Sequence, residues 1–181
     1  MYAATIAVWI ASEIALGIVR RSRAGEDQQR DRGSAILLWI GITASVIAGI
    51  GLAQIPATRM PPAAFSIGLA LIYLGLIVRW TAILTLRRYF TIDVAIREDH
   101  QLVDHGIYRL VRHPAYTGCL LSFAGLGIAM RNWASLAAIL VGTGIVFGYR
   151  IVVEERVLRE ALGERYRAYE MRTKRLIPGI L

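Results

Sequence analysis

Five long apolar stretches divide this chain, and polar segments separate them. A helix needs about 20 mostly apolar residues to cross roughly 30 Å of hydrocarbon. Most of the stretches reach or approach that length, and the fourth is the shortest. We therefore predict an all-α, polytopic membrane bundle of about five spanning helices. The spans are expected over residues 2–19, 34–55, 63–86, 115–130 and 134–153.

Two details refine this prediction. Only Arg131, Asn132 and Trp133 separate the last two spans, so these should form a tight helical hairpin. The first span contains Glu13 and has its arginines after it rather than before it, unlike a signal peptide. We interpret it as a retained span, and the whole chain, 1–181, as a single membrane domain.

Composition and charge agree with a membrane protein. Hydrophobic residues make up 56% of the chain, and the mean hydropathy is +0.50. A net charge of +8 can indicate nucleic-acid binding. However, the connections and the C-terminal region carry five, one, five, one and eight Lys or Arg residues in chain order. This alternation predicts an N-terminus outside and a C-terminus in the cytoplasm, and it explains the charge without a nucleic-acid partner. We expect the membrane to be the plasma membrane of a prokaryote.

Charged and small residues within the spans need explanations. Glu13 and Arg79 are expected at similar depths and could pair, although Arg79 could instead snorkel or form the polar floor of a site. Close helix packing is the main explanation for the glycines, and at Gly118 the alternative is close approach of a ligand to the backbone. These glycines are Gly49, Gly51, Gly68, Gly75, Gly118, Gly125, Gly127, Gly144 and Gly148.

The polar segment over residues 87–114 is long for a connection and too apolar for disorder. We expect an ordered cytoplasmic cap with a short helix over 106–111, and Pro114 in the first turn of the fourth span. The segment holds all three histidines, of which His105 is predicted to be a solvated loop residue. With one cysteine, Cys119, a zinc site of the CxxC type is excluded and no metal is predicted.

A second polar segment follows the fifth span. Its pattern predicts an amphipathic helix that breaks at Gly163, and then a helical piece with Tyr166 and Tyr169. Arg150 and Glu154 are four residues apart, as in an ion pair on one helix face, which is one interpretation of them. Arg175 either helps to close a site or anchors the C-terminal region at anionic headgroups.

These two segments carry a recognisable set of motifs. They are His100-Gln101-Leu102-Val103, Gly106-Ile107-Tyr108, Arg112-His113-Pro114-Ala115-Tyr116-Thr117-Gly118 and, forty residues beyond Pro114, Glu154-Glu155. Together they resemble the core signature of the isoprenylcysteine carboxyl methyltransferase family, and phospholipid methyltransferases carry a looser version. The resemblance covers roughly residues 87–181. One departure is Ile107, where the family often has proline.

The resemblance implies an integral membrane methyltransferase that uses S-adenosylmethionine, bound by residues 87–118 and 150–181. It places Arg150 at the methyl acceptor and makes Arg150, Glu154 and Glu155 the expected catalytic residues, with Glu154 favoured over Glu155 for the cofactor. The implied cofactor contacts are His100, Gln101, Leu102, Val103, Tyr108, His113, Pro114, Ala115, Tyr116, Gly118 and Glu154.

The chemistry of these residues fits that expectation. Glutamate suits the cationic cofactor, the apolar and tyrosine side chains suit its purine, and an arginine can hold an acceptor carboxylate in two places. A carboxylate needs no general base, whereas an amine would need Glu155 or a histidine. The expected partners are a lipophilic or prenylated acceptor and membrane lipids, and no oligomeric state is predicted.

Other functions remain open at this point. The second choice is N-methylation of a phospholipid or another lipid amine. An NADPH-dependent sterol or enone reductase is less favoured, because those reductases typically have Asn and Asp where this chain has Ala115 and Cys119. A membrane scaffold without activity would have no use for the motifs.

Overall fold

The computed structural model describes residues 5, 8–9, 11–12, 32–87 and 102–179, and within them the fold is all-α, as predicted. Two isolated β-bridges are present and no strand is formed in this part of the chain. The first predicted span lies mostly outside the described residues. The helices are α2 (Arg32–Leu52), α3 (Ala64–Leu86), α4 (Pro114–Ala129), α5 (Trp133–Leu162) and α6 (Glu164–Arg172), with 3-10 turns η2 (Pro56–Thr58) and η4 (Gly106–Arg109).

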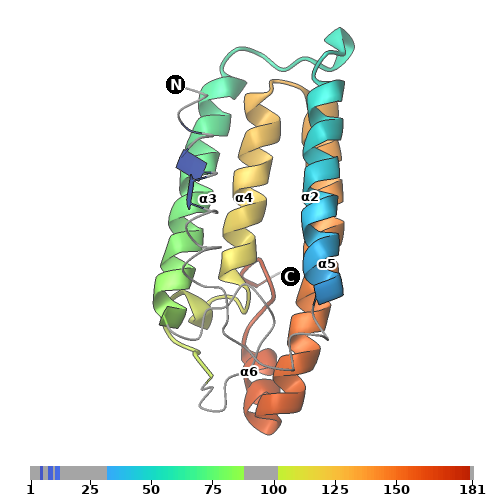
Figure 1. The fold of residues 1–181 in the computed structure, drawn as a ribbon. Helices are drawn as coiled ribbons and strands as arrows, with labels where there is room; N and C mark the ends of the chain where they lie inside the picture. The colour runs from blue at the N-terminus through green and yellow to red at the C-terminus, as the bar shows by residue number, and fades with distance from the viewer. Residues whose placement is uncertain (1–4, 6–7, 10, 13–31, 88–101, 180–181) are drawn as a thin grey trace.

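The long helices run side by side, as Figure 1 shows, and their composition is that of a membrane bundle. The helices α3 and α5, with 23 and 30 residues, are long and apolar enough to cross a membrane, and Ile36–Leu52 of α2 and the helix α4 are shorter apolar segments. At 1.5 Å per residue α5 is about 45 Å long. It therefore extends beyond roughly 30 Å of hydrocarbon, and its charged turns from Glu154 onward lie outside the apolar stretch.

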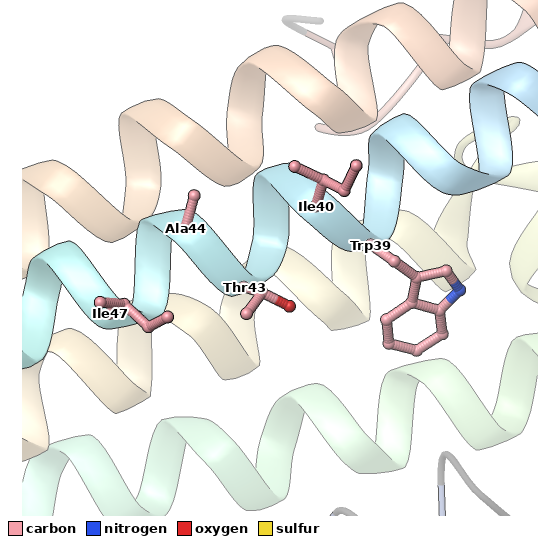
Figure 2. Close-up of a pocket in the computed structure, with 5 residues that line it drawn as sticks. All are labelled: Trp39, Ile40, Thr43, Ala44 and Ile47. Atoms are coloured by element: carbon pink, nitrogen blue, oxygen red, sulfur yellow. The ribbon is translucent and has the colours of Figure 1, made fainter.

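Apolar side chains on the outside of the bundle agree with a lipid environment. Trp39, Ile40 and Ile47 of α2 are 53%, 61% and 64% exposed. With Thr43 and Ala44 they line a shallow, open surface on this helix, drawn in Figure 2. An exposed apolar patch of this kind is typical of membrane or protein contact.

Glycines bring α3 and α4 into close contact, as predicted. A Cβ atom added at Gly68 would lie 2.6 Å from the carbonyl oxygen of Gly125, and one added at Gly75 would lie 2.5 Å from that of Gly118. Such distances require backbone to approach backbone, which only glycine permits. The helices pack as two pairs, α3 with α4 and α2 with α5, which meet between α4 and α5.

For three other glycines the described helices offer no packing partner. Cβ atoms added at Gly51, Gly144 and Gly148 would meet no described atom within 4 Å. The Gly-x-x-x-Gly motif of α5 therefore lies on a face that packs against none of the described helices. The spacing of small residues identifies a face but does not say whether a neighbouring helix covers it.

Polar contacts close one end of the bundle, where the α2–α3 connection meets the turn between α4 and α5 (Figure 1). The amide of Met60 donates to the carbonyl of Arg131 over 2.7 Å. The fully buried side chain of Asn132 accepts from the amide of Ser135 and donates to the carbonyl of Ile55, each over 3.0 Å. Asn132 thus caps α5 and fixes the predicted tight hairpin.

The other end of the bundle holds η4, α6 and the tail, by which we mean residues 173–179. Gly163, with φ of +54°, ends α5 and allows α6 to fold back, as predicted. The predicted short helix over 106–111 is present as the 3-10 turn η4, which ends at Arg109. Every predicted site residue that the structure describes lies near this end.

Candidate active site

The motif segment begins with η4, which α6 holds in place. Tyr108 is buried, and its carbonyl accepts a 2.6 Å hydrogen bond from the hydroxyl of Tyr169 on α6. Pro114 is the first residue of α4, as predicted, where its missing amide leaves no donor unsatisfied. The chain enters α4 through His113, which is 3% exposed. The motif is thus part of the packed end of the bundle.

Glu155 is the centre of an ion network at this end. Its carboxylate is fully buried and lies 3.1 Å from Nε of Arg112 and 2.8 Å from Nη2 of Arg175. Nη2 of Arg159 lies 3.2 Å away, and Nε2 of His113 lies 3.4 Å away. Arg159 also binds the carboxylate of Glu170 over 2.7 Å. These contacts join α4, α5, α6 and the tail, so Glu155 has a structural role.

Electrostatics keep this glutamate ionised. Burial alone would raise the pKa of Glu155, but hydrogen bonds from His113 and Arg175 and the positive charge of Arg112 outweigh it and hold the pKa well below its usual range. The same contact raises the pKa of Arg175. Burial also raises the pKa of Tyr169 to about 12 and that of Tyr108 further, so both phenols are neutral at physiological pH.

Glu154, the other member of the pair, faces a different set of side chains. Its carboxylate accepts a 2.9 Å hydrogen bond from the hydroxyl of Tyr116 on α4. Tyr116 also interacts with Arg150, which precedes Glu154 by one turn of α5. The guanidinium of Arg150 is 2% exposed and donates to the hydroxyl of Ser34 at the start of α2. Glu154 is only partly buried, so it is the more accessible of the two glutamates.

Arg79 adds a second arginine to this region. Nη1 of Arg79 lies 2.8 Å from the sulfur of Cys119. The charges of Arg79 and Glu154 both act on the phenol of Tyr108. Arg79 therefore lies near predicted site residues, in line with its interpretation as part of a polar floor. Glu13, its hypothetical partner, lies outside the described residues.

The remaining predicted cofactor contacts differ in whether the structure describes them and in how buried they are. His100 and Gln101 lie outside the described residues, whereas Leu102, Val103 and Ala115 are partly buried. A Cβ atom at Gly118 would lie 2.6 Å from the amide nitrogen of Arg79, so helix packing accounts for this glycine. His105 is exposed, as predicted.

The sequence did not reveal several residues that complete the site. Ser34, Arg112, Arg159 and Glu170 were assigned no role, although Arg112 belongs to the motif. For Arg159 a signal existed, because Glu155 and Arg159 are four residues apart on one helix. Arg175 joins the network from the tail, and neither of the two predicted alternatives included its contact with Glu155.

Comparisons with known proteins agree with the motif. The phospholipid methyltransferase family matches residues 63–165. A protein-S-isoprenylcysteine O-methyltransferase B from Arabidopsis thaliana is 38% identical over 115 residues, which are 62% of this chain and 58% of that protein. A protein-S-isoprenylcysteine O-methyltransferase from Tribolium castaneum is 34% identical over 117 residues, covering 64% of this chain and 42% of that one.

A solved structure extends the similarity to the fold. The structure of a eukaryotic intramembrane Ras methyltransferase, isoprenylcysteine carboxyl methyltransferase, superposes with a TM-score of 0.61 at 29% identity. The match covers 87% of this chain and 55% of that one, so the chain spans about half the length of these relatives. The family match includes more than half of the residues of this chain. The chain therefore belongs to the phospholipid methyltransferase family, as the resemblance predicted.

Proposed function

We propose that this protein is an S-adenosylmethionine-dependent methyltransferase that acts on a lipophilic acceptor at the membrane surface. The closest activity would be O-methylation of an isoprenylcysteine-type carboxylate. The observation that carries the proposal is the hydrogen bond between Glu154 and Tyr116 beside Arg150. An acidic and a basic side chain thus lie together where two apolar helices meet the polar end of the bundle.

The residues present suit the cofactor. S-Adenosylmethionine has a sulfonium, an ammonium, a carboxylate and a flat purine. The partly buried carboxylate of Glu154 suits a cationic group of the cofactor, and Leu102, Val103 and Tyr108 offer apolar and aromatic surface for the purine. We also propose the predicted contacts from His113, Pro114, Ala115 and Tyr116. The bound cofactor would supply the methyl group.

Arg150 suits the acceptor. Its guanidinium is buried at the polar end of α5, and Ser34 of α2 holds one of its nitrogens. A guanidinium binds a carboxylate in two places and so orients it. An acceptor with a greasy tail could then keep that tail among the apolar helices while its carboxylate reaches Arg150. Arg150 would therefore be the main residue that selects for a carboxylate.

The chemistry required of the protein is modest. Methyl transfer is a direct displacement at carbon, so catalysis depends on alignment of the two reactants and exclusion of water. A carboxylate acceptor is ionised at neutral pH and transfers no proton. Glu155 has no free position for a substrate proton while it binds its cationic partners, which supports a mechanism without a general base.

The second candidate is N-methylation of a phospholipid or another lipid amine, which the description of the matched family favours. An amine acceptor must lose a proton, and Arg150 would repel it if it were protonated. The relatives named above are methyltransferases, which disfavours the reductase alternative. A carboxylate acceptor remains our first proposal because of Arg150.

We further propose the predicted orientation, with the site in the cytoplasm, in the plasma membrane of a prokaryote. The relatives named above are eukaryotic, and the proposed orientation rests on the distribution of basic residues. Among the described residues, Arg59 and Arg131 are the basic ones at the end distant from the site, whereas α6 and the tail carry several. In a Cys119→Ala background, Arg131→Cys should react with an impermeant maleimide in intact cells. Arg167→Cys should react only after permeabilisation, and the opposite result refutes this orientation.

Cofactor binding is tested by calorimetry with S-adenosylhomocysteine and, separately, NADPH. The wild type should bind the former, and Glu154→Gln should weaken that binding by at least about tenfold, the value of one charge-assisted hydrogen bond. The matched control is Glu160→Gln, an exposed position of the same helix. Binding of NADPH alone would overturn the proposal, and binding of neither ligand would favour a scaffold.

The acceptor class is tested by transfer of a labelled methyl group to a farnesylcysteine analogue and to a lipid extract. A methyl ester releases labelled methanol in base, whereas an N-methyl product is stable to base. We expect base-labile product, and Arg150→Gln should raise the KM for the acceptor while the Kd of S-adenosylhomocysteine stays the same. Base-stable product would establish the second candidate instead.

A further inference from the structure

The tail lies directly against the start of α4. The amide of Arg112 donates to the carbonyl of Lys174 over 2.8 Å, and the amide of His113 donates to that of Arg175 over 2.9 Å. Val111 and Lys174 form a parallel bridge. The tail thus adds a short extended pairing to the residues that lead into α4.

A side-chain contact continues this pairing into the helix. The hydroxyl of Thr117, in the first turn of α4, donates to the carbonyl of Leu176 over 2.8 Å. Since Pro114 has no amide, the amides of Arg112 and His113 are the last donors before the helix. Both are satisfied by the tail, so the backbone of the motif depends on residues about sixty positions away in the sequence.

One ion pair fastens the tail in place. Arg175 donates to Glu155 through Nε at 3.1 Å and through Nη2 at 2.8 Å, which is the two-point geometry of a strong charge-assisted contact. The Glu155 carboxylate is fully buried, whereas the Arg175 side chain is 43% exposed. The arginine can therefore be changed with little disturbance of the core, unlike the glutamate.

The same contact reaches the other half of the site. Glu155 lies next to Glu154 on α5, and adjacent residues of a helix point about 100° apart. With Glu155 held by the tail and by α4, Glu154 faces Tyr116. A shift of the tail would thus be felt both at the backbone of residues 112–117 and at the direction of Glu154.

We propose that Arg175 is a positioning residue. Its contact with Glu155, which we call the latch, fastens the tail and so holds the His113–Thr117 segment in the conformation that binds the cofactor. This inference rests on the proposed function for its consequence, but the latch itself does not. Arg175 is not expected to touch the reacting atoms. Its loss should weaken cofactor binding and leave the acceptor site intact.

The latch is tested without any ligand, by hydrogen exchange of the peptide that covers residues 111–118. In Arg175→Ala the amides of Arg112 and His113 should exchange at least about tenfold faster than in the wild type, because a charge-assisted contact of this strength no longer holds the tail. Arg175→Lys, which keeps the charge but not the two-point contact, should be intermediate. Unchanged exchange in Arg175→Ala would overturn the latch.

Positioning is tested on the same proteins by calorimetry and initial rates. Arg175→Ala should raise the Kd of S-adenosylhomocysteine and the KM of the methyl donor about tenfold, and the KM of the acceptor should stay within twofold. A purely structural defect would lower the active fraction, and hence kcat, without changing either constant. The control is Arg167→Ala, which breaks an exposed ion pair with Glu164 on α6.

The outcomes separate the two ideas. Faster exchange with an unchanged Kd would refute positioning and keep the proposed function. A wild-type protein that does not bind S-adenosylhomocysteine would refute the proposed function and positioning with it, whereas hydrogen exchange would still decide the latch. Recovery of the Kd in Arg175→Lys would support a role for the charge of this side chain.

Discussion

Glu155→Gln removes the charge at the centre of the ion network and nearly preserves the shape of the side chain. Loss of one partner of a buried ion pair costs about 3–5 kcal/mol. Arg112 keeps its hydrogen bond to the carbonyl of Glu170, and Arg159 keeps its ion pair with the Glu170 carboxylate, so each of these two cations still has an acceptor. We therefore expect a loss near the lower limit, about 3 kcal/mol. For a chain of this size that loss lowers the unfolding midpoint by about 6–12 °C.

The protein carries its own probe for this measurement. Cys119 is its single cysteine and is buried, so a fluorogenic maleimide reacts with it when α4 comes away from its neighbours. Glu164→Gln is the matched control, because the Glu164 carboxylate forms an exposed pair with Arg167 that contributes little to stability. A midpoint for Glu155→Gln equal to that of the control would show that the network does not stabilise the fold.

Three further predictions are checked by the unfolding midpoint. It is measured as above except in acid, where circular dichroism replaces the maleimide because maleimides react with the thiolate form of cysteine. Since the pKa of Glu155 is lowered from 4.5, its contribution is complete above that pH and is lost as the pH falls below it, so the wild-type midpoint should fall more between pH 5 and pH 3.5 than that of Glu155→Gln. A midpoint that falls equally in both proteins would contradict this. Gly75→Ala should cost about 1–3 kcal/mol by overpacking against α4, whereas Gly144→Ala should be neutral or stabilising. Asn132→Ala should cost about 1–2 kcal/mol through loss of the α5 cap. An equal effect of the two glycine changes, or an unshifted midpoint for Asn132→Ala, would refute the packing or the cap.

Hydropathy predicted much of the fold because membrane helices obey simple length and polarity rules. The expected spans over 63–86 and 115–130 correspond to α3 and α4 within two residues, and the chain breaks just before α5 and at Gly163, as the sequence predicted. The motif residues that the structure describes also lie together at one end of the bundle. These features depend on neighbouring residues, which a sequence displays directly.

Contacts between distant residues could not be predicted in the same way. The partners of Glu155 include Arg112, 43 residues before it, and Arg175, 20 residues after it, and no local pattern links them. The hydrogen bond between Ser34 and Arg150 joins residues 116 positions apart and depends on how α2 packs against α5. For the same reason the sequence could not show that Gly144 and Gly148 pack against none of the described helices, since it displays a small-residue face but not the neighbour of that face.

The glutamate pair illustrates how two identical neighbours acquire different roles. Both carry the same charge and lie on the same turn of α5, so the sequence could favour Glu154 only by resemblance. In the structure the difference lies in the partners, because three arginines and a histidine surround Glu155, whereas Glu154 meets Tyr116 and stays partly accessible. A carboxylate with several cations has little attraction left for another. We therefore propose Glu154 as the glutamate whose charge is available to a cationic ligand, and Glu155 as the one that fixes where Glu154 points.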